Sequence, residues 1–176
     1  MADKQVYSII FEIESIIKWI IVLRITLNHT EYKLTKLPNK STVFKNVQRD
    51  ADKRGNILSI VDEPVKNVSI ITCTPGSIRS NHYHYEDFHF MYVLEGDFDY
   101  FYKDINTKEI FYYKVMEGDT IFTPPNEIHA CYFPKRTSLI VSSKNSRDQN
   151  TYEADTVRVD FITQSNISDM LANYGK

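Results

Sequence analysis

Alternating apolar and polar positions fill most of the chain after residue 28, and this is the period of a β-strand rather than of a helix. In the clearest run, Phe88–Leu94, the even-numbered residues form one apolar face, and His89 lies on the other face with Met91 and Val93. Candidate strands, separated by glycine, proline and polar turns, are Ile57–Val61, Val65–Cys73, Phe88–Glu95, Asp97–Lys103, Glu109–Val115, Thr120–Thr123, Ile128–Phe133, Ser138–Ser143 and Val157–Ile162. This series of short strands predicts an all-β sandwich or barrel.

The two ends of the chain depart from this pattern. Residues 6–27 are strongly apolar, but their longest uncharged apolar run, Trp19–Leu23, is too short to span a bilayer. We interpret this segment as an amphipathic helix or a pair of strands that packs on the domain or on a second subunit; an interfacial membrane anchor or an appendage without function are the alternatives. Residues 165–174 predict one short helix, capped by Ser165 or Asn166. We therefore divide the chain into an apolar extension, residues 1–28, and a barrel domain, residues 29–176.

Composition narrows the class of function. A length of 176 residues suits one domain, and 12 tyrosines and 10 phenylalanines favour a sheet. The 21 basic residues are balanced by 23 acidic ones, so no overall positive charge attracts nucleic acid. Two cysteines, Cys73 and Cys131, are too few for a disulfide framework, which predicts a cytoplasmic location.

Four of the five histidines fall between residues 82 and 129. His82 and His84 are two apart, so on a strand their imidazoles share one face. His89 follows after a turn and His129 begins a later strand, so a small barrel can bring all four to one point. Imidazole nitrogens bind zinc, iron, nickel and copper, and neutral imidazole also moves protons, so the cluster predicts a metal or acid–base site. Cys131 has the strand parity of His129 and is expected to face the same cavity.

The spacing of these histidines resembles that of the cupin superfamily. Its first signature, G-x5-H-x-H-x(3,4)-E-x6-G, corresponds to Gly76, His82, His84, His89 and Gly96, with histidine in place of the glutamate. Its second, G-x5-P-x-G-x2-H-x3-N, corresponds to Gly118, Pro124, Asn126, His129 and Phe133, with changes at the last glycine and at the asparagine. The resemblance implies a double-stranded β-helix, the cupin or jelly-roll barrel. It also implies a divalent transition metal (Zn, Fe, Ni or Mn) bound by His82, His84, His89 and His129, an all-imidazole ligand set.

A narrower resemblance covers Asp50–Val61, Gly76–His84 and Thr151–Val159. These segments are similar to cupins that process nucleotide-linked sugars: dTDP-4-dehydrorhamnose 3,5-epimerases, dTDP-4-keto-6-deoxyglucose 3,4-ketoisomerases and the cupin half of capsular polysaccharide enzymes. Ser80 stands where these proteins often have glycine in R-G-x-H-x-H. The resemblance implies that Arg54 and Arg79 contact the diphosphate, and that His82 or His84 moves a proton beside a ketone.

Metal binding by all four histidines would leave none of them free as a base. The alternative proton carriers nearby are then Tyr83, Tyr92, Glu86 and Cys131. Three functions stay open: an isomerase or epimerase acting on a nucleotide-linked keto sugar in polysaccharide or deoxysugar biosynthesis, a metal-dependent dioxygenase or other oxidoreductase, and a non-catalytic binding barrel. Arginines at the barrel mouth favour the first function, an apolar mouth the second, and a closed four-histidine site the third. The expected partners are a small molecule and a second copy of the chain in a homodimer.

Overall fold

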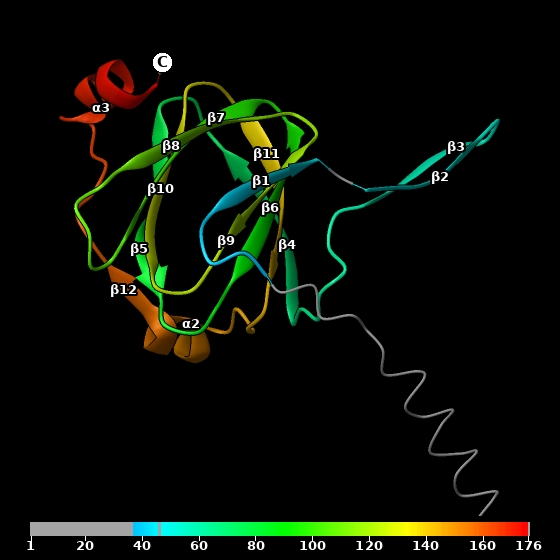
Figure 1. Ribbon diagram of the computed structural model, residues 1–176, viewed down its shortest axis with the longest axis horizontal. Helices are drawn as coiled ribbons and strands as arrows, with labels where there is room; N and C mark the ends of the chain where they lie inside the picture. Colours follow the sequence, from blue (N-terminus) through cyan, green and yellow to red (C-terminus); the bar gives the residue numbers. More distant parts are fainter. Residues whose placement is uncertain (1–36, 46, 176) are drawn as a thin grey trace, which may run out of the picture. The chain divides into compact units, whose positions relative to one another are not determined.

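Two antiparallel sheets of five strands each form a β-sandwich in the computed structural model, which describes residues 37–45 and 47–175 (Figure 1). The first sheet has the order β1 (Thr42–Lys45), β9 (Asp119–Thr123), β6 (His89–Glu95), β11 (Thr137–Ser143) and β4 (Asn67–Cys73). The second has the order β12 (Thr156–Arg158), β5 (Ser77–His84), β10 (Glu127–Phe133), β7 (Asp97–Asp104) and β8 (Phe111–Met116). The described chain also contains a separate hairpin of β2 (Val47–Asp52) and β3 (Gly55–Ser59), and two short helices, α2 (Gln149–Asp155) and α3 (Ile167–Tyr174).

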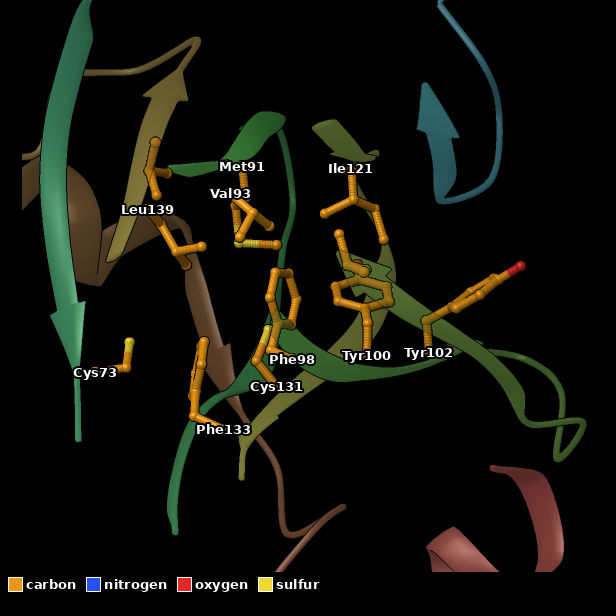
Figure 2. Packing of buried hydrophobic residues seen from close by; sticks show 12 residues of the cluster. Cys73, Met91, Val93, Phe98, Tyr100, Tyr102, Ile121, Cys131, Phe133 and Leu139 are labelled. Carbon is orange, nitrogen blue, oxygen red and sulfur yellow. The ribbon is translucent and has the colours of Figure 1, made fainter. Parts of the chain in front are cut away.

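The core lies between the two sheets. Strand alternation turns one face of each sheet inward, so Met91 and Val93 from the first sheet meet Phe98 and Tyr100 from the second (Figure 2). A second cluster covers the outer face of the second sheet, where Phe161 and other residues near α3 pack on β7 and β10. Because β7 and β10 are buried on both faces, every residue from Asp97 to Tyr102 is buried, including those between the inward positions.

The predicted cupin-type barrel is confirmed, with differences at its margins. The expected strand at 157–162 ends at Arg158. Beyond it the Val159 N–H donates to the Asn81 carbonyl at 2.8 Å, and the side chain of Asn81 bonds to Ile162: its Nδ2 donates to the Ile162 carbonyl at 2.7 Å and its Oδ1 accepts from the Ile162 N–H at 2.9 Å. The candidate strands did not include β1, β2 or β5, although the spacing of His82 and His84 was interpreted as that of a strand, and α2 was not expected. The carboxyl-terminal helix is present with Asn166 as its N-cap residue, although its side chain accepts from the Thr163 N–H rather than from the helix.

Several expectations stay predictions. The apolar segment 6–27 and the domain boundary at residue 28 lie outside the described residues. The described residues contain no helix that is long and apolar enough to cross a membrane. The cytoplasmic location and the homodimer are not tested by the structure of one chain.

Candidate active site

The four imidazoles lie together at one end of the space between the sheets. His82 and His84 come from β5, His129 from the adjacent β10, and His89 from β6 in the facing sheet. Ring centroids are 4.7 Å apart for His82 and His84, and also 4.7 Å apart for His82 and His129, which are opposite each other in the β5–β10 ladder. His89 approaches to 5.0 Å from His129 and 5.7 Å from His84. The structure therefore brings together all four histidines that the sequence singled out.

A β-bulge in β5 places Arg79 on the same face as His82. These residues are three apart, and a regular strand would turn them to opposite faces. The register shifts between His129, which pairs with His82, and Ala130, which pairs with Ser80, so Asn81 is the extra residue. Ser80 and Asn81 have φ values of 67° and 56°, in the left-handed region where glycine has no steric penalty. Beyond the bulge Arg79 pairs with the inward-facing Cys131.

Hydrogen bonds set the tautomer of His129 and the orientation of His84. The Nδ1 of His129 lies 3.1 Å from the Glu127 carbonyl oxygen, which only accepts, so Nδ1 carries the proton. Its Nε2 then has a free lone pair, and this buried atom has no hydrogen-bond partner within the described chain. On the other side, His84 Nδ1 lies 3.3 Å from Thr156 Oγ1 and 3.6 Å from Asp155 Oδ2. Residues from the β12 end of the chain therefore orient His84.

Burial keeps the cluster neutral. Removal from water lowers the pKa of His82 to about 2 and that of His129 to about 3, with neighbouring imidazoles adding to the effect on both. The pKa values of His84 and His89 are lowered by the same main cause, although Asp155 opposes it at His84. Neutral imidazole has a lone pair, so the rings are in the form that binds a metal or accepts a proton.

A cavity of about 80 Å³ opens beside the cluster. Its apolar side includes Met91 and Leu139, and its polar lining is Arg79, Ser80, His82, His89, Cys131, Arg147 and Tyr152. Cys131 faces this cavity, as its strand parity predicted. The ring of Tyr152, from α2, is 6.3 Å from that of His82, and the guanidinium of Arg147 lies 5.6 Å from the centre of the Tyr152 ring. The cavity thus combines imidazoles, a phenol and two guanidinium groups.

Two residues proposed from the sequence lie elsewhere. Tyr83 alternates with His82 and His84 along β5, so it turns to the opposite face and packs on the second cluster. Arg54 lies at the β2–β3 turn, where it pairs with Asp52 at 2.6 Å and is 80% exposed, and it does not line this cavity. Sequence reasoning missed Arg147 and Tyr152. Tyr152 lies within the segment 151–159 that carried the narrower resemblance, which was the one available indication.

The residues present fit a divalent metal. One ligand atom each from His84, Asp87 and His89 lies within 4.8 Å of the others, and all three residues are buried. The Nδ1 of His89 is buried without a hydrogen-bond partner in the described chain, as is Nε2 of His129. Imidazole and carboxylate ligands suit zinc, iron and other first-row divalent ions. Asp87 was not among the ligands expected from the sequence.

Residues 50–156 match the family model described as the polysaccharide biosynthesis C-terminal domain. The chain belongs to this family. The matched region contains all four clustered histidines, Asp87, both cavity arginines and Tyr152. The family is thus defined over the stretch that builds the site. A search of curated proteins gave no match.

Solved structures show that this family member has a cupin-like fold. QdtA, a sugar 3,4-ketoisomerase from Thermoanaerobacterium thermosaccharolyticum solved with TDP, matches 78% of this chain and 98% of its own, with 17% identity and a TM-score of 0.57. WlaRA, a TDP-fucose-3,4-ketoisomerase from Campylobacter jejuni, matches 66% and 87%, with 16% identity and a TM-score of 0.56. The capsular polysaccharide assembling protein CapF from Staphylococcus aureus matches over 67% of this chain but only 33% of its own length, with 21% identity and a TM-score of 0.51.

Proposed function

We propose that this protein isomerises a nucleotide-linked keto sugar by moving its carbonyl group between neighbouring carbons, as a sugar 3,4-ketoisomerase does. The observation that carries the proposal is the cavity itself, in which His82 and Tyr152 lie beside Arg79 and Arg147. Proton-transfer groups and two cations in one cavity suit a substrate with an acidic C–H bond and a diphosphate. The family match and the TDP-sugar ketoisomerases of like fold support the same substrate class.

The reaction needs two proton transfers on carbon and two on oxygen. A base removes the proton from C3 beside the C4 ketone, and the C4 oxygen gains a proton, which gives an enediol. A proton then returns to C4 while the C3 hydroxyl loses its own, which leaves the ketone at C3. His82 is the proposed base, because its neutral imidazole lines the cavity. Tyr152 is the proposed group for proton transfer at oxygen. A divalent metal, when bound by the histidine cluster, supplies a Lewis acid that polarises a sugar oxygen.

Arg79 and Arg147 are the proposed diphosphate contacts. Guanidinium groups bind phosphate oxygens with two parallel hydrogen bonds, and both arginines line the same cavity as His82. The cavity volume of about 80 Å³ holds about three water molecules. A sugar ring therefore enters only when side chains at the mouth shift.

The test uses TDP-4-keto-6-deoxyglucose, the ligand of a QdtA structure, with the full chain in D2O and proton NMR as the readout. We expect deuterium at the carbon that is reprotonated, together with a 3-keto product. His82→Asn should slow exchange by at least about 100-fold, whereas Tyr83→Phe, on the opposite face of β5, should leave the rate unchanged. Absence of both exchange and product with TDP- and UDP-linked keto sugars, or full activity in His82→Asn, would overturn the proposal.

A metal-dependent oxygenase is the second candidate function. The grouping of His84, Asp87 and His89 favours it, because two imidazoles and one carboxylate are the ligand set of non-haem iron oxygenases. The two cavity arginines favour the isomerase, since they suit an anionic substrate. Oxygen consumption by the Fe²⁺-loaded protein in the presence of a small organic substrate would support the oxygenase instead.

A further inference from the structure

We infer that the histidine cluster is divided between two tasks: His84, Asp87 and His89 bind a divalent first-row transition metal, while His82 and His129 stay outside its ligand set. This inference rests on the proposed function for the task assigned to His82. The ligand set differs from the all-imidazole set that the cupin resemblance implies, because a carboxylate replaces two of the four rings.

The geometry selects these three residues. One ligand atom of each lies within 4.8 Å of the others. Atoms bound to one metal at about 2.1 Å lie about 3.0–3.4 Å apart, so the side chains need to close by no more than about 2 Å. All three residues come from one stretch of chain, the end of β5, the turn after it and the start of β6. His84 and His89 belong to facing sheets, but only four residues separate them along the chain, so the short turn that carries Asp87 limits their separation.

Asp87 is a buried carboxylate without an ion-pair partner in the described chain. It is 4% exposed, and its Oδ1 accepts a hydrogen bond from the Asn145 N–H at 2.9 Å. Within the described chain, no lysine or arginine nitrogen lies at ion-pair distance from it. A buried charge without an ion-pair partner is costly, and the positive charges of Lys144 and Arg147 act on Asp87 only from beyond ion-pair distance, so a bound ion would supply the missing contact. The bond to Asn145 also orients Asp87 from outside, as the outer partners of metal ligands do.

The two proposed imidazole ligands, His84 and His89, differ in the hydrogen bonding of their Nδ1 atoms. His89 is 3% exposed, and its Nδ1 has no hydrogen-bond partner in the described part of the chain, which is the state of a ligand nitrogen that awaits its metal. His84 is held at Nδ1 by Thr156 and Asp155, which leaves Nε2 for coordination. Asp155 also accepts the backbone N–H groups of Glu86 and Asp87, at 2.8 and 2.9 Å. One residue therefore braces both the His84 ligand and the turn that carries Asp87.

This division removes a conflict between metal binding and proton transfer. A nitrogen that binds a metal cannot also accept a proton. With the metal on His84, Asp87 and His89, the lone pair of His82 remains free beside the cavity. The competing arrangement uses the unpartnered Nε2 of His129, whose ring is 5.0 Å from that of His89, so variants at His129 must decide between the two sets.

The experiment measures metal content of the full chain after removal of metal with a chelator and reloading with Zn²⁺ or Co²⁺. We expect about one ion per chain in the unmodified protein. Asp87→Asn and His89→Gln should hold less than about a tenth of that, and His82→Gln and His129→Gln should retain it. Asp87→Asn keeps the size of the side chain and an oxygen for the Asn145 N–H, so far-UV circular dichroism should show an unchanged fold.

A second readout covers the case in which a variant fails to fold. In the Co²⁺ form of the unmodified protein, paramagnetic NMR should show strongly shifted signals from two imidazoles, whereas the all-imidazole set predicts four. Four such signals, full metal content in Asp87→Asn, or no ion bound after reloading with both metals would overturn the inference. Isomerase activity that persists in the metal-free chain would not contradict the ligand assignment. If the metal-loaded chain shows the expected metal contents in all four variants but has no isomerase activity, only the proposed function is refuted.

Discussion

Asn81 is the residue whose replacement most directly tests how the site is built. It is the extra residue of the β5 bulge, it adopts a left-handed φ of 56°, and its side chain makes two hydrogen bonds to the backbone of Ile162. Asn81→Ala removes both bonds, each of which contributes about 0.5–1.5 kcal/mol. It also puts an ordinary side chain into the left-handed region, at a further cost of about 1 kcal/mol. We expect the free energy of unfolding to fall by about 2–4 kcal/mol.

Urea unfolding followed by circular dichroism measures this change. Asn81→Gly serves as the matched control, because it removes the same two bonds but relaxes the backbone at positive φ. The glycine variant should therefore lose less stability than the alanine variant. It should also bind TDP more weakly than the unmodified protein, since the bulge is what aligns Arg79 with His82. A loss below about 1 kcal/mol in Asn81→Ala, or equal losses in both variants, would show that the bulge does not depend on this side chain.

Two further predictions concern stability. Gly96→Ala should cost about 2–4 kcal/mol, because a Cβ would lie 2.7 Å from the backbone carbonyl oxygen of Arg136. Gly118→Ala meets no atom within 4 Å and should cost only about 1 kcal/mol of backbone strain; similar melting temperatures for the two variants would contradict this. For Asp97, burial raises the pKa, but Lys114 and Lys135 outweigh it and lower the pKa overall. Its stabilisation is therefore present above pH 4 and lost as the pH falls through the lowered pKa. Asp97→Asn should be less stable than the unmodified chain at pH 7, and this difference should shrink in acid unfolding curves.

Local sequence rules were sufficient for most strands of the two sheets and for the clustered histidines. Alternation with period two placed β6, β7 and β10 within a residue or so of their observed bounds. The spacing of His82, His84, His89 and His129 was enough to predict that their rings meet, because a closed barrel with these turns has one interior. Rules of this kind depend on neighbours along the chain, which the sequence lists directly.

Other parts of the site depended on contacts between distant segments. Arg79 shares a face with His82 only because Asn81 is expelled from the ladder and held by Ile162, 81 residues away. Asp87 joins the histidines because Asp155 and Asn145 hold its turn, and Tyr152 reaches the cavity from a helix that alternation could not reveal. The sequence by itself determined the kind of barrel and the imidazoles inside it. Tertiary structure alone decided which carboxylate and phenol accompany them, and that Arg79 rather than Arg54 joins Arg147 in the cavity, because bulges and turns are stabilised by hydrogen bonds whose partners are remote in the chain.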